Sequence, residues 1–197
     1  MVAADLVGPT GSVLGLDRDP DSVGWATRRV TEAGYANIRF QACEFNEFTD
    51  ARQFDALVGR FILMYLPDPA AILLRLSAQL KRGGAIAFFE PDYTLPSVAF
   101  PDVSLFHQCE GWFVAALQAS GARVDMGMRL HQTYRAASFV KAGSMVSHLS
   151  GCGLSPEIAK FYSETIRSIL PKIEQYNIAS AAEVGIDTLA ERLEAAA

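Results

Sequence analysis

Short apolar runs alternate with amphipathic stretches along the first half of the chain. The runs that predict strands are Ser12–Leu16, Asn37–Ala42, Phe54–Val58 and Ala85–Phe89. Most of them are continuously apolar rather than alternating, which is typical of parallel strands buried on both faces. The pattern therefore predicts an α/β protein whose parallel sheet has helices on both faces.

Helix start and stop signals separate these runs. Asp19 suits an N-cap and Pro20 suits the first helical position, so a helix is expected to run from there to Gly34. A second amphipathic helix is expected over Ala70–Leu80, closed by the sequence Lys-Arg-Gly-Gly.

The second half is predicted to be mostly helical. Pro171 should kink or split the third of its helices. No repeat or linker interrupts residues 1–197, so the chain is expected to form a single domain. The expected helices are Ser104–Ser120, Arg129–Ala142, Glu157–Gln175 and Glu183–Ala197, with a short strand over Ser144–Leu149.

Composition and charge narrow the function classes. Half of the 197 residues are hydrophobic, a fifth are charged and the formal net charge is −5, which argues against nucleic acid as the main partner. No run reaches the roughly 18 apolar residues of a membrane span, and the N-terminus has no signal-peptide pattern. The three cysteines lack metal-ligand spacing, so reduced thiols, no metal site and a cytoplasmic location are expected.

One acidic residue stands where a ligand is expected. Asp17 ends the first predicted strand, and ligands of open α/β sheets bind at the carboxyl ends of strands. A carboxylate there can accept hydrogen bonds from both hydroxyls of a ribose, which makes Asp17 a candidate nucleoside-binding residue. The alternative is a solvated loop acid beside a helix cap.

A longer ordered set of motifs is more specific. The segment F-D-A-L-V-G-R-F-I-L-M-Y-L-P-D-P is followed by a helical stretch and then by K-R-G-G-A-I-A-F-F-E-P-D. With G-P-T-G-S-V-L-G-L-D, this set resembles the second, fourth and fifth strands of class I S-adenosylmethionine-dependent methyltransferases, above all their ubiquinone/menaquinone-biosynthesis-like small-molecule branch. The resemblance implies a Rossmann-like parallel sheet, with residues 1–95 on the cofactor side and 96–197 as a helical substrate side.

The resemblance implies roles in binding S-adenosylmethionine. Asp17 would bind the ribose hydroxyls, and Arg18 would lie beside the adenine. Cys43 stands where the family usually has the acid that meets the adenine amino group, and Glu44 follows it as a substitute. Gly59–Arg60, just after the fourth strand, would border the methionine end, although Arg60 also suits a plain surface position.

Methyl transfer asks the protein mainly to hold donor and acceptor in line in a dry pocket. The resemblance would place Met64 and Tyr65 near the methyl group, although Met64 equally suits a core position. For acceptors that need a base, four residues after the fifth strand are candidates, and the acids among them also suit a capping role. These candidates are Glu90, Asp92, Tyr93 and His107.

The family's first strand and its glycine-rich turn have no counterpart in this sequence. Those glycines let the backbone approach the cofactor, and the strand normally lies between the second and the fourth. Its absence predicts a gap or an irregular pairing in the sheet. The chain is therefore expected to be a methyltransferase truncated at both ends.

Three function classes stay open. The first is a methyltransferase that uses S-adenosylmethionine on a small molecule, without nucleic-acid or membrane partners and compatible with a homodimer. The second is a non-catalytic methyltransferase-like partner or scaffold, which the missing glycine turn favours. The third is a nicotinamide-binding oxidoreductase, because an acid after the second strand also suits that cofactor.

Overall fold

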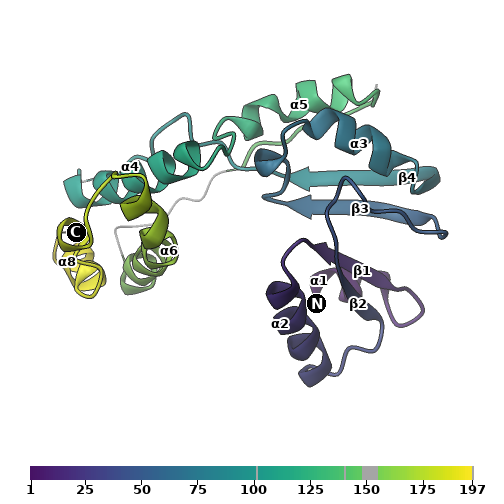
Figure 1. Ribbon diagram of the computed structural model, residues 1–197, viewed down its shortest axis with the longest axis horizontal. Helices are drawn as coiled ribbons and strands as arrows, with labels where there is room; N and C mark the ends of the chain where they lie inside the picture. Colours follow the sequence, from purple (N-terminus) through teal and green to yellow (C-terminus); the bar gives the residue numbers. More distant parts are fainter. Residues whose placement is uncertain (101, 140, 148–154, 197) are drawn as a thin grey trace. The chain divides into compact units, whose positions relative to one another are not determined.

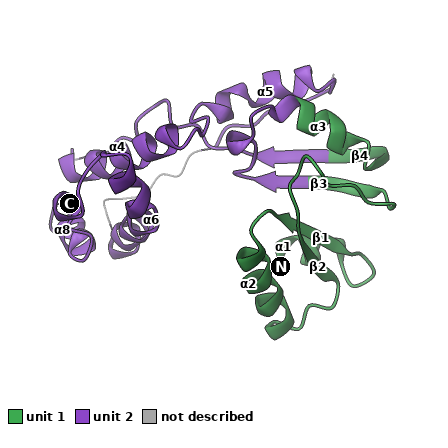
Figure 2. Cartoon of the chain, in the orientation of Figure 1, with its two compact units in different colours: residues 1–57, 71–85 green, residues 58–70, 86–197 purple. Residues whose placement is uncertain are grey.

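The computed structural model describes residues 1–100, 102–139, 141–147 and 155–196 (Figure 1). The chain divides into two compact units, one of residues 1–57 and 71–85 and the other of residues 58–70 and 86–197 (Figure 2). None of the helices in the described part of the chain combines the length and the hydropathy that a membrane crossing requires.

The N-terminal segment alternates helices and strands around a small core. Its elements are α1 (Val2–Val7), β1 (Val13–Asp17), α2 (Pro20–Glu32) and β2 (Ile38–Ala42). β1 and β2 pair in parallel, with Val13 opposite Ile38 and Asp17 opposite Ala42. Ala4, Val30 and Ile38 are buried together. Helix α2 therefore provides the crossover connection that two parallel strands require.

Helix α2 begins and ends as the sequence predicted. The Asp19 side chain accepts hydrogen bonds from the N–H groups of Asp21 and Ser22, and Pro20 occupies the first turn. The Ser22 hydroxyl, and after it the Asp21 N–H, hold the pKa of Asp19 below its usual value. Gly34 has a φ of 78°, the left-handed conformation that glycine adopts after a helix.

Strands β3 (Phe54–Arg60) and β4 (Leu80–Phe89) form a second two-stranded sheet. A 3-10 turn (Leu63–Tyr65) and α3 (Pro69–Ser77) connect them. The Phe54 N–H donates to Gln79 O and the Phe61 N–H donates to Phe89 O, so the strands run in the same direction, as their arrows show in Figure 1.

The start of β4 differs from the prediction. Helix α3 ends at Ser77, and the Lys-Arg-Gly-Gly segment lies inside β4 instead of closing a helix. β4 has ten residues against seven in β3, and Gly83 within it has a φ of 82°. Glycine adopts this left-handed conformation without steric cost, so the chain can bend at Gly83.

The four predicted strands are present and parallel, but they do not form one sheet. β1 pairs with β2 and β3 pairs with β4, as two separate two-stranded sheets. The α/β class is confirmed, and the expectation of one parallel sheet of at least four strands is wrong. The separation agrees with the gap that was predicted where the family's first strand has no counterpart. A strand inside a sheet pairs its N–H and C=O groups with a neighbouring strand on each side. Among the described residues, β1 and β3 each have a neighbouring strand on one side only.

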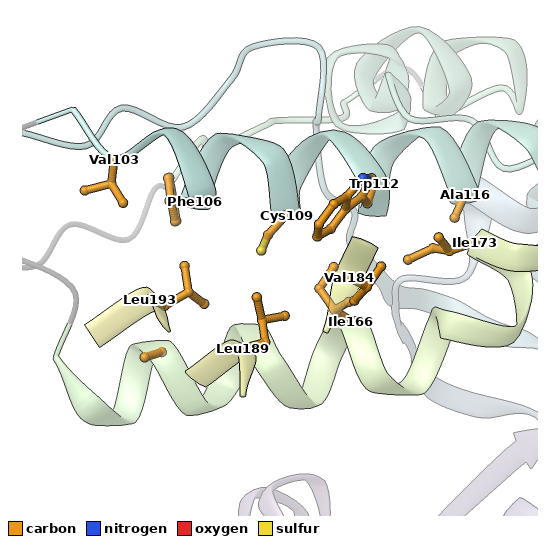
Figure 3. Packing of buried hydrophobic residues seen from close by; sticks show 11 residues of the cluster. Val103, Phe106, Cys109, Trp112, Ala116, Ile166, Ile173, Val184, Leu189 and Leu193 are labelled. Carbon is orange, nitrogen blue, oxygen red and sulfur yellow. The ribbon is translucent and has the colours of Figure 1, made fainter. Parts of the chain in front are cut away.

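The C-terminal half is helical, as predicted, with a buried core of its own. Figure 3 shows Phe106, Cys109 and Trp112 of α4 pointing toward buried residues of the later helices, among them Ile166 and Leu189. The helices are α4 (Ser104–Ala119), α5 (Met126–Ala136), α6 (Pro156–Gln175), α7 (Ala181–Val184) and α8 (Leu189–Ala195).

Three predictions for this half are wrong in detail. The helix expected over Arg129–Ala142 is α5, which runs over Met126–Ala136 and ends there because Ser138 adopts a left-handed φ of 68°. The expected last helix is divided into α7 and α8, because Gly185 adopts a left-handed φ of 54° and ends α7. The expected strand Ser144–Leu149 is not formed over residues 144–147, while residues 148 and 149 lie outside the described ranges, as does residue 197.

Helix α6 continues unsplit through Pro171, against one of the two expectations for this residue. Pro171 is exposed and has no N–H to donate to the carbonyl four residues earlier. The helix persists because its opposite face is buried at Ala159, Ser163, Ile166 and Ile173.

We expect Pro171→Ala to stabilise the protein, because alanine restores the missing donor and relieves the ring clash. The gain is up to about 3 kcal/mol, or several degrees in Tm by calorimetry. Ser168→Ala, also exposed on α6, removes only the hydroxyl that donates to Thr165 O and changes helix propensity slightly, so it should shift Tm much less. A lower Tm for Pro171→Ala than for the parent would show that the proline is not the weak point of this helix.

Candidate functional site

The residues singled out from the sequence fall into two groups. Asp17, Arg18, Cys43 and Glu44 belong to the compact unit of residues 1–57 and 71–85. The second group belongs to the other unit and consists of Gly59, Arg60, Glu90, Asp92, Tyr93 and His107.

The structure brings Asp17 and Cys43 together at the carboxyl ends of β1 and β2. The Cys43 N–H donates to Asp17 O at 2.9 Å and extends the ladder by one bond. The Asp17 side chain is exposed, and its Oδ1 accepts the Asp19 N–H at 3.0 Å. Its Oδ2 accepts no hydrogen bond from any described residue. Asp17 is thus held in place with acceptor capacity to spare.

Neither the thiol nor the backbone N–H of Cys43 can replace an acidic side chain as a hydrogen-bond acceptor. Burial, and then the charges of Glu44 and Glu47, raise the pKa of the Cys43 thiol. A protonated thiol is a weak acceptor, and the Cys43 N–H is already donated to the strand ladder. The side chain of Glu44 is exposed next to it, as is that of Arg18 after β1. An acceptor at this end of the sheet is therefore better supplied by Glu44 than by Cys43.

Gly59 and Arg60 are the last two residues of β3 and do not follow the strand as predicted. A Cβ on Gly59 would lie 2.2 Å from Cε1 of Phe88, so the glycine makes room for that ring on the neighbouring strand. Arg60 is exposed, and its Cζ lies 4.6 Å from the centroid of the Phe61 ring. This distance is that of a cation–π contact.

Two buried side chains, Leu63 and Met64, precede the exposed Tyr65 in the turn that follows β3. Met64 is only 2% exposed and lies in the core, which was one of its two predicted positions. Tyr65 is 49% exposed. Of these two neighbours, Tyr65 is therefore the one that can contact a ligand.

Glu90 holds this turn from the end of β4. Its side chain is buried, and Oε1 accepts the N–H groups of Ile62 and Leu63 at 3.0 and 2.9 Å. Its Oε2 accepts the Met64 N–H at 3.2 Å. Both carboxylate oxygens are committed to the backbone, which favours the capping alternative over a role as base.

Asp92 caps helix α5 from outside the helix. Its Oδ2 accepts the Met128 N–H at 2.9 Å, and its Oδ1 accepts the Thr94 N–H at 3.0 Å. Burial alone raises the pKa of Asp92, but the hydrogen bonds from Thr94 and Met128 outweigh it and lower that pKa. The Gly127 N–H also donates to Pro91 O. The start of α5 is therefore fixed by the residues just after β4.

Tyr93 lies between α4 and the residues at the end of β3. Its ring packs edge-on against Phe113 with centroids 5.3 Å apart. Burial, and then Tyr65, raise the pKa of the Tyr93 phenol, while Arg60 acts in the opposite direction. Tyr93 therefore remains a neutral hydrogen-bond donor close to two polar side chains of the segment after Gly59.

His107 is partly exposed on α4 and lies between two carboxylates. Its Nε2 is 2.9 Å from Asp102 Oδ1, and its Nδ1 is 3.9 Å from Glu110 Oε2. A carboxylate in hydrogen-bond contact orients the imidazole ring. Among the four base candidates, the carboxylates of Glu90 and Asp92 accept backbone N–H groups. The side chains of His107 and Tyr93 do not.

A cavity of about 360 Å³, which the sequence analysis missed, opens between α5 and the start of α3. The Arg123 guanidinium donates to Pro67 O at 2.5 Å, and that of Arg129 is bonded to Asp125. Both cations thus hold the chain around the cavity. No short motif could reveal it, because its lining comes from Pro67, Asp68, Pro69, Ala70, Arg123, Arg129, Gln132, Thr133 and Ala136.

Comparison with known proteins decides the family. A family model described as a methyltransferase domain matches residues 1–136. The chain belongs to this methyltransferase family. The match covers β1 to α5 and thus every candidate residue named above.

Two curated relatives are similar over more than half of this chain. The aklanonic acid methyltransferase DauC of Streptomyces sp. (strain C5) is 32% identical over 125 residues, which are 58% of this chain and 57% of DauC. The arsenite methyltransferase of Aquipseudomonas alcaligenes is 28% identical over 120 residues, 56% of this chain and 35% of that protein. This chain thus spans about half, or less, of each relative.

Among solved structures, a candidate methyltransferase from Bacillus halodurans C-125 superposes with a TM-score of 0.48 at 16% identity. The superposition covers 64% of this chain and 52% of that one.

We expect Gly59→Ala to destabilise the protein, because the new methyl group would overlap the Phe88 ring. Overpacking of this kind costs about 1–3 kcal/mol, measured as a lower Tm. Gly24→Ala in α2 is the matched control, since a Cβ there meets nothing within 4 Å. Alanine at that helical position should stabilise by about 0.5–1 kcal/mol. Equal Tm values for the two variants would argue against the packing role of Gly59.

We expect Asp92→Asn to lower Tm at neutral pH by the equivalent of about 1 kcal/mol, because asparagine lacks the charge and has one acceptor oxygen for two N–H groups. The folded-state pKa of Asp92 lies below its ordinary value of 3.8, so its contribution is present above that value. It is lost as the pH falls through the lowered pKa. Melting curves from pH 7 to pH 2.5 should therefore converge at the acidic end, and a constant gap would contradict the assigned cap.

Proposed function

We propose that this chain is an S-adenosylmethionine-dependent methyltransferase acting on a small molecule. The observation that carries the proposal is the exposed Asp17 carboxylate at the end of β1, in a chain matched by the methyltransferase-domain family. It is held by the start of α2 and keeps an oxygen for a ligand.

The residues of the N-terminal unit fit the nucleoside part of this cofactor. Each carboxylate oxygen has two lone pairs, so Asp17 can hold the Asp19 N–H and still accept two ribose hydroxyls. Glu44 offers an exposed carboxylate for the adenine amino group, and Arg18 can lie along the ring. We assign Cys43 a place beside the adenine without a polar side-chain contact, because its thiol stays protonated.

The residues of the other unit, taken by themselves, fit the chemistry of the reacting end. We assign Arg60 to the carboxylate of the methionine part, since a guanidinium pairs strongly with carboxylates. Gly59, next to Arg60, makes room for the Phe88 ring at this strand end. When bound, the cofactor supplies an activated methyl group on a sulfonium. Tyr93 can donate a hydrogen bond to the acceptor, and His107 is the residue we propose to take a proton from acceptors that lose one.

The names of the two relatives support a small-molecule acceptor. One is described as acting on aklanonic acid and the other on arsenite, so both substrates are small. The family match removes the reason for the nicotinamide-binding alternative. A non-catalytic methyltransferase-like role is the second candidate, because the separation of the strands into two sheets favours it.

We expect Asp17→Ala to abolish binding of S-adenosylhomocysteine in calorimetry. Two charge-assisted hydrogen bonds, worth about 1.5–3 kcal/mol each, correspond to a loss of more than 100-fold. Asp17→Asn tests the charge while keeping an acceptor for the Asp19 N–H. Asp21→Ala removes a nearby charge and should retain the parent affinity.

The outcomes separate the two candidate functions. Equal affinity for the parent and Asp17→Ala would remove Asp17 from the site. A parent chain that folds but binds neither S-adenosylmethionine nor S-adenosylhomocysteine would support the non-catalytic role.

A further inference from the structure

The residue after β3 has an unfavourable backbone conformation. Phe61 has a φ of 56°, in the left-handed region that bulky residues rarely adopt. Such a conformation persists only where the surrounding structure holds it. The question is therefore which contacts hold Phe61.

Hydrogen bonds from four consecutive backbone N–H groups hold Phe61, because all four donate to Phe89 or Glu90. The Phe61 N–H donates to Phe89 O at 2.9 Å. The next three, from Ile62 to Met64, donate to the two carboxylate oxygens of Glu90 at 2.9–3.2 Å. Successive N–H groups that converge in this way form an anion-binding concavity, and here the anion is a side chain of the same protein.

Glu90 is well suited to this task and poorly suited to proton transfer. It is 7% exposed, and among the described residues its hydrogen-bond partners are backbone N–H groups alone. A buried carboxylate of this kind is stabilised by the donors around it. Removing the carboxylate group would leave those donors unsatisfied in the interior.

The conformation of Phe61 determines where Arg60 lies. The Phe61 ring packs against the Phe89 ring with centroids 5.4 Å apart, and the Arg60 guanidinium lies 4.6 Å from the Phe61 ring centroid. If Phe61 relaxed to a negative φ, its ring would leave Phe89 and Arg60 would lose the surface on which it rests. Arg60 is thus coupled to Glu90 through one strained residue.

We propose that Glu90 is a positioning residue: its carboxylate keeps Phe61 in the left-handed conformation and so fixes Arg60 for the methionine end of the cofactor. The role rests on the proposed function for its ligand, but the coupling between Glu90 and Arg60 does not. The acid after β4 thereby acts on the cofactor through the turn after β3 and not on the acceptor.

Glu90→Gln is the informative variant, because glutamine has the same size. Its Oε1 can still accept from Ile62 and Leu63, but its NH₂ group would face the Met64 N–H, donor against donor. The turn should loosen without a large cavity. Glu183→Gln is the matched control, since Glu183 also accepts a backbone N–H, from Ser180 in the capping box of α7.

The ligand-binding test is a double-mutant cycle on S-adenosylhomocysteine affinity with Glu90→Gln, Arg60→Ala and the double variant. We expect Glu90→Gln to weaken binding about tenfold, the loss of one charge-assisted contact. In the Arg60→Ala background the same change should have almost no further effect. A purely structural Glu90 would lower affinity equally in both backgrounds, and that additivity would overturn the proposal.

The second test needs no ligand. The Phe61 ring should shift the NMR signals of the Arg60 side chain, and this shift should vanish in Glu90→Gln but persist in Glu183→Gln. Persistence in Glu90→Gln would overturn the proposal whether or not the chain binds a cofactor. A parent that binds no S-adenosylhomocysteine but loses the shift in Glu90→Gln would contradict the proposed function and leave the coupling supported.

Discussion

Acidic side chains that accept backbone N–H groups hold the ends of the strands in this protein. After β1, Asp17 accepts from Asp19, and Asp19 in turn accepts from the first turn of α2. After β4, Glu90 accepts from the turn that follows β3, and Asp92 accepts from α5. Strand ends expose N–H groups that no ladder uses, and a nearby carboxylate satisfies them at short range. The acids that suggest chemistry in the sequence are thus first of all part of the fold.

Local signals in the sequence were sufficient where the contact partners are near in sequence. The Asp19-Pro20 start of α2 and the glycine after it depend on residues within one turn, and both were predicted correctly. The contact of Glu90 with the Ile62–Met64 backbone spans 26 to 28 positions and exists only because β3 pairs with β4. Propensity and periodicity carry no information about such a register.

The family resemblance identified the right fold class, and the two separate strand pairs agree with the gap that it predicts where the family's first strand has no counterpart. A parallel strand in a buried sheet normally has neighbours on both sides, whereas β1 and β3 have one each among the described residues. Unused N–H and C=O groups on a strand favour pairing with another strand. The two pairs are nevertheless formed, since each has its own connecting helix and its own hydrogen-bonded ladder.

Under the proposed function, the thiol at Cys43 would concentrate recognition of the cofactor on the ribose. Where an acid would accept from the adenine amino group, this chain has a thiol whose pKa is raised by burial and by two neighbouring glutamates. Its backbone N–H is bound to Asp17 O, so the same bond that closes the β1–β2 ladder removes a donor from the site. Selectivity for adenine over another base would then depend on Glu44, an exposed side chain with many rotamers, and a flexible acceptor discriminates less than a fixed one. Asp17, held by the cap of α2, is the group that is already in place before a nucleoside arrives.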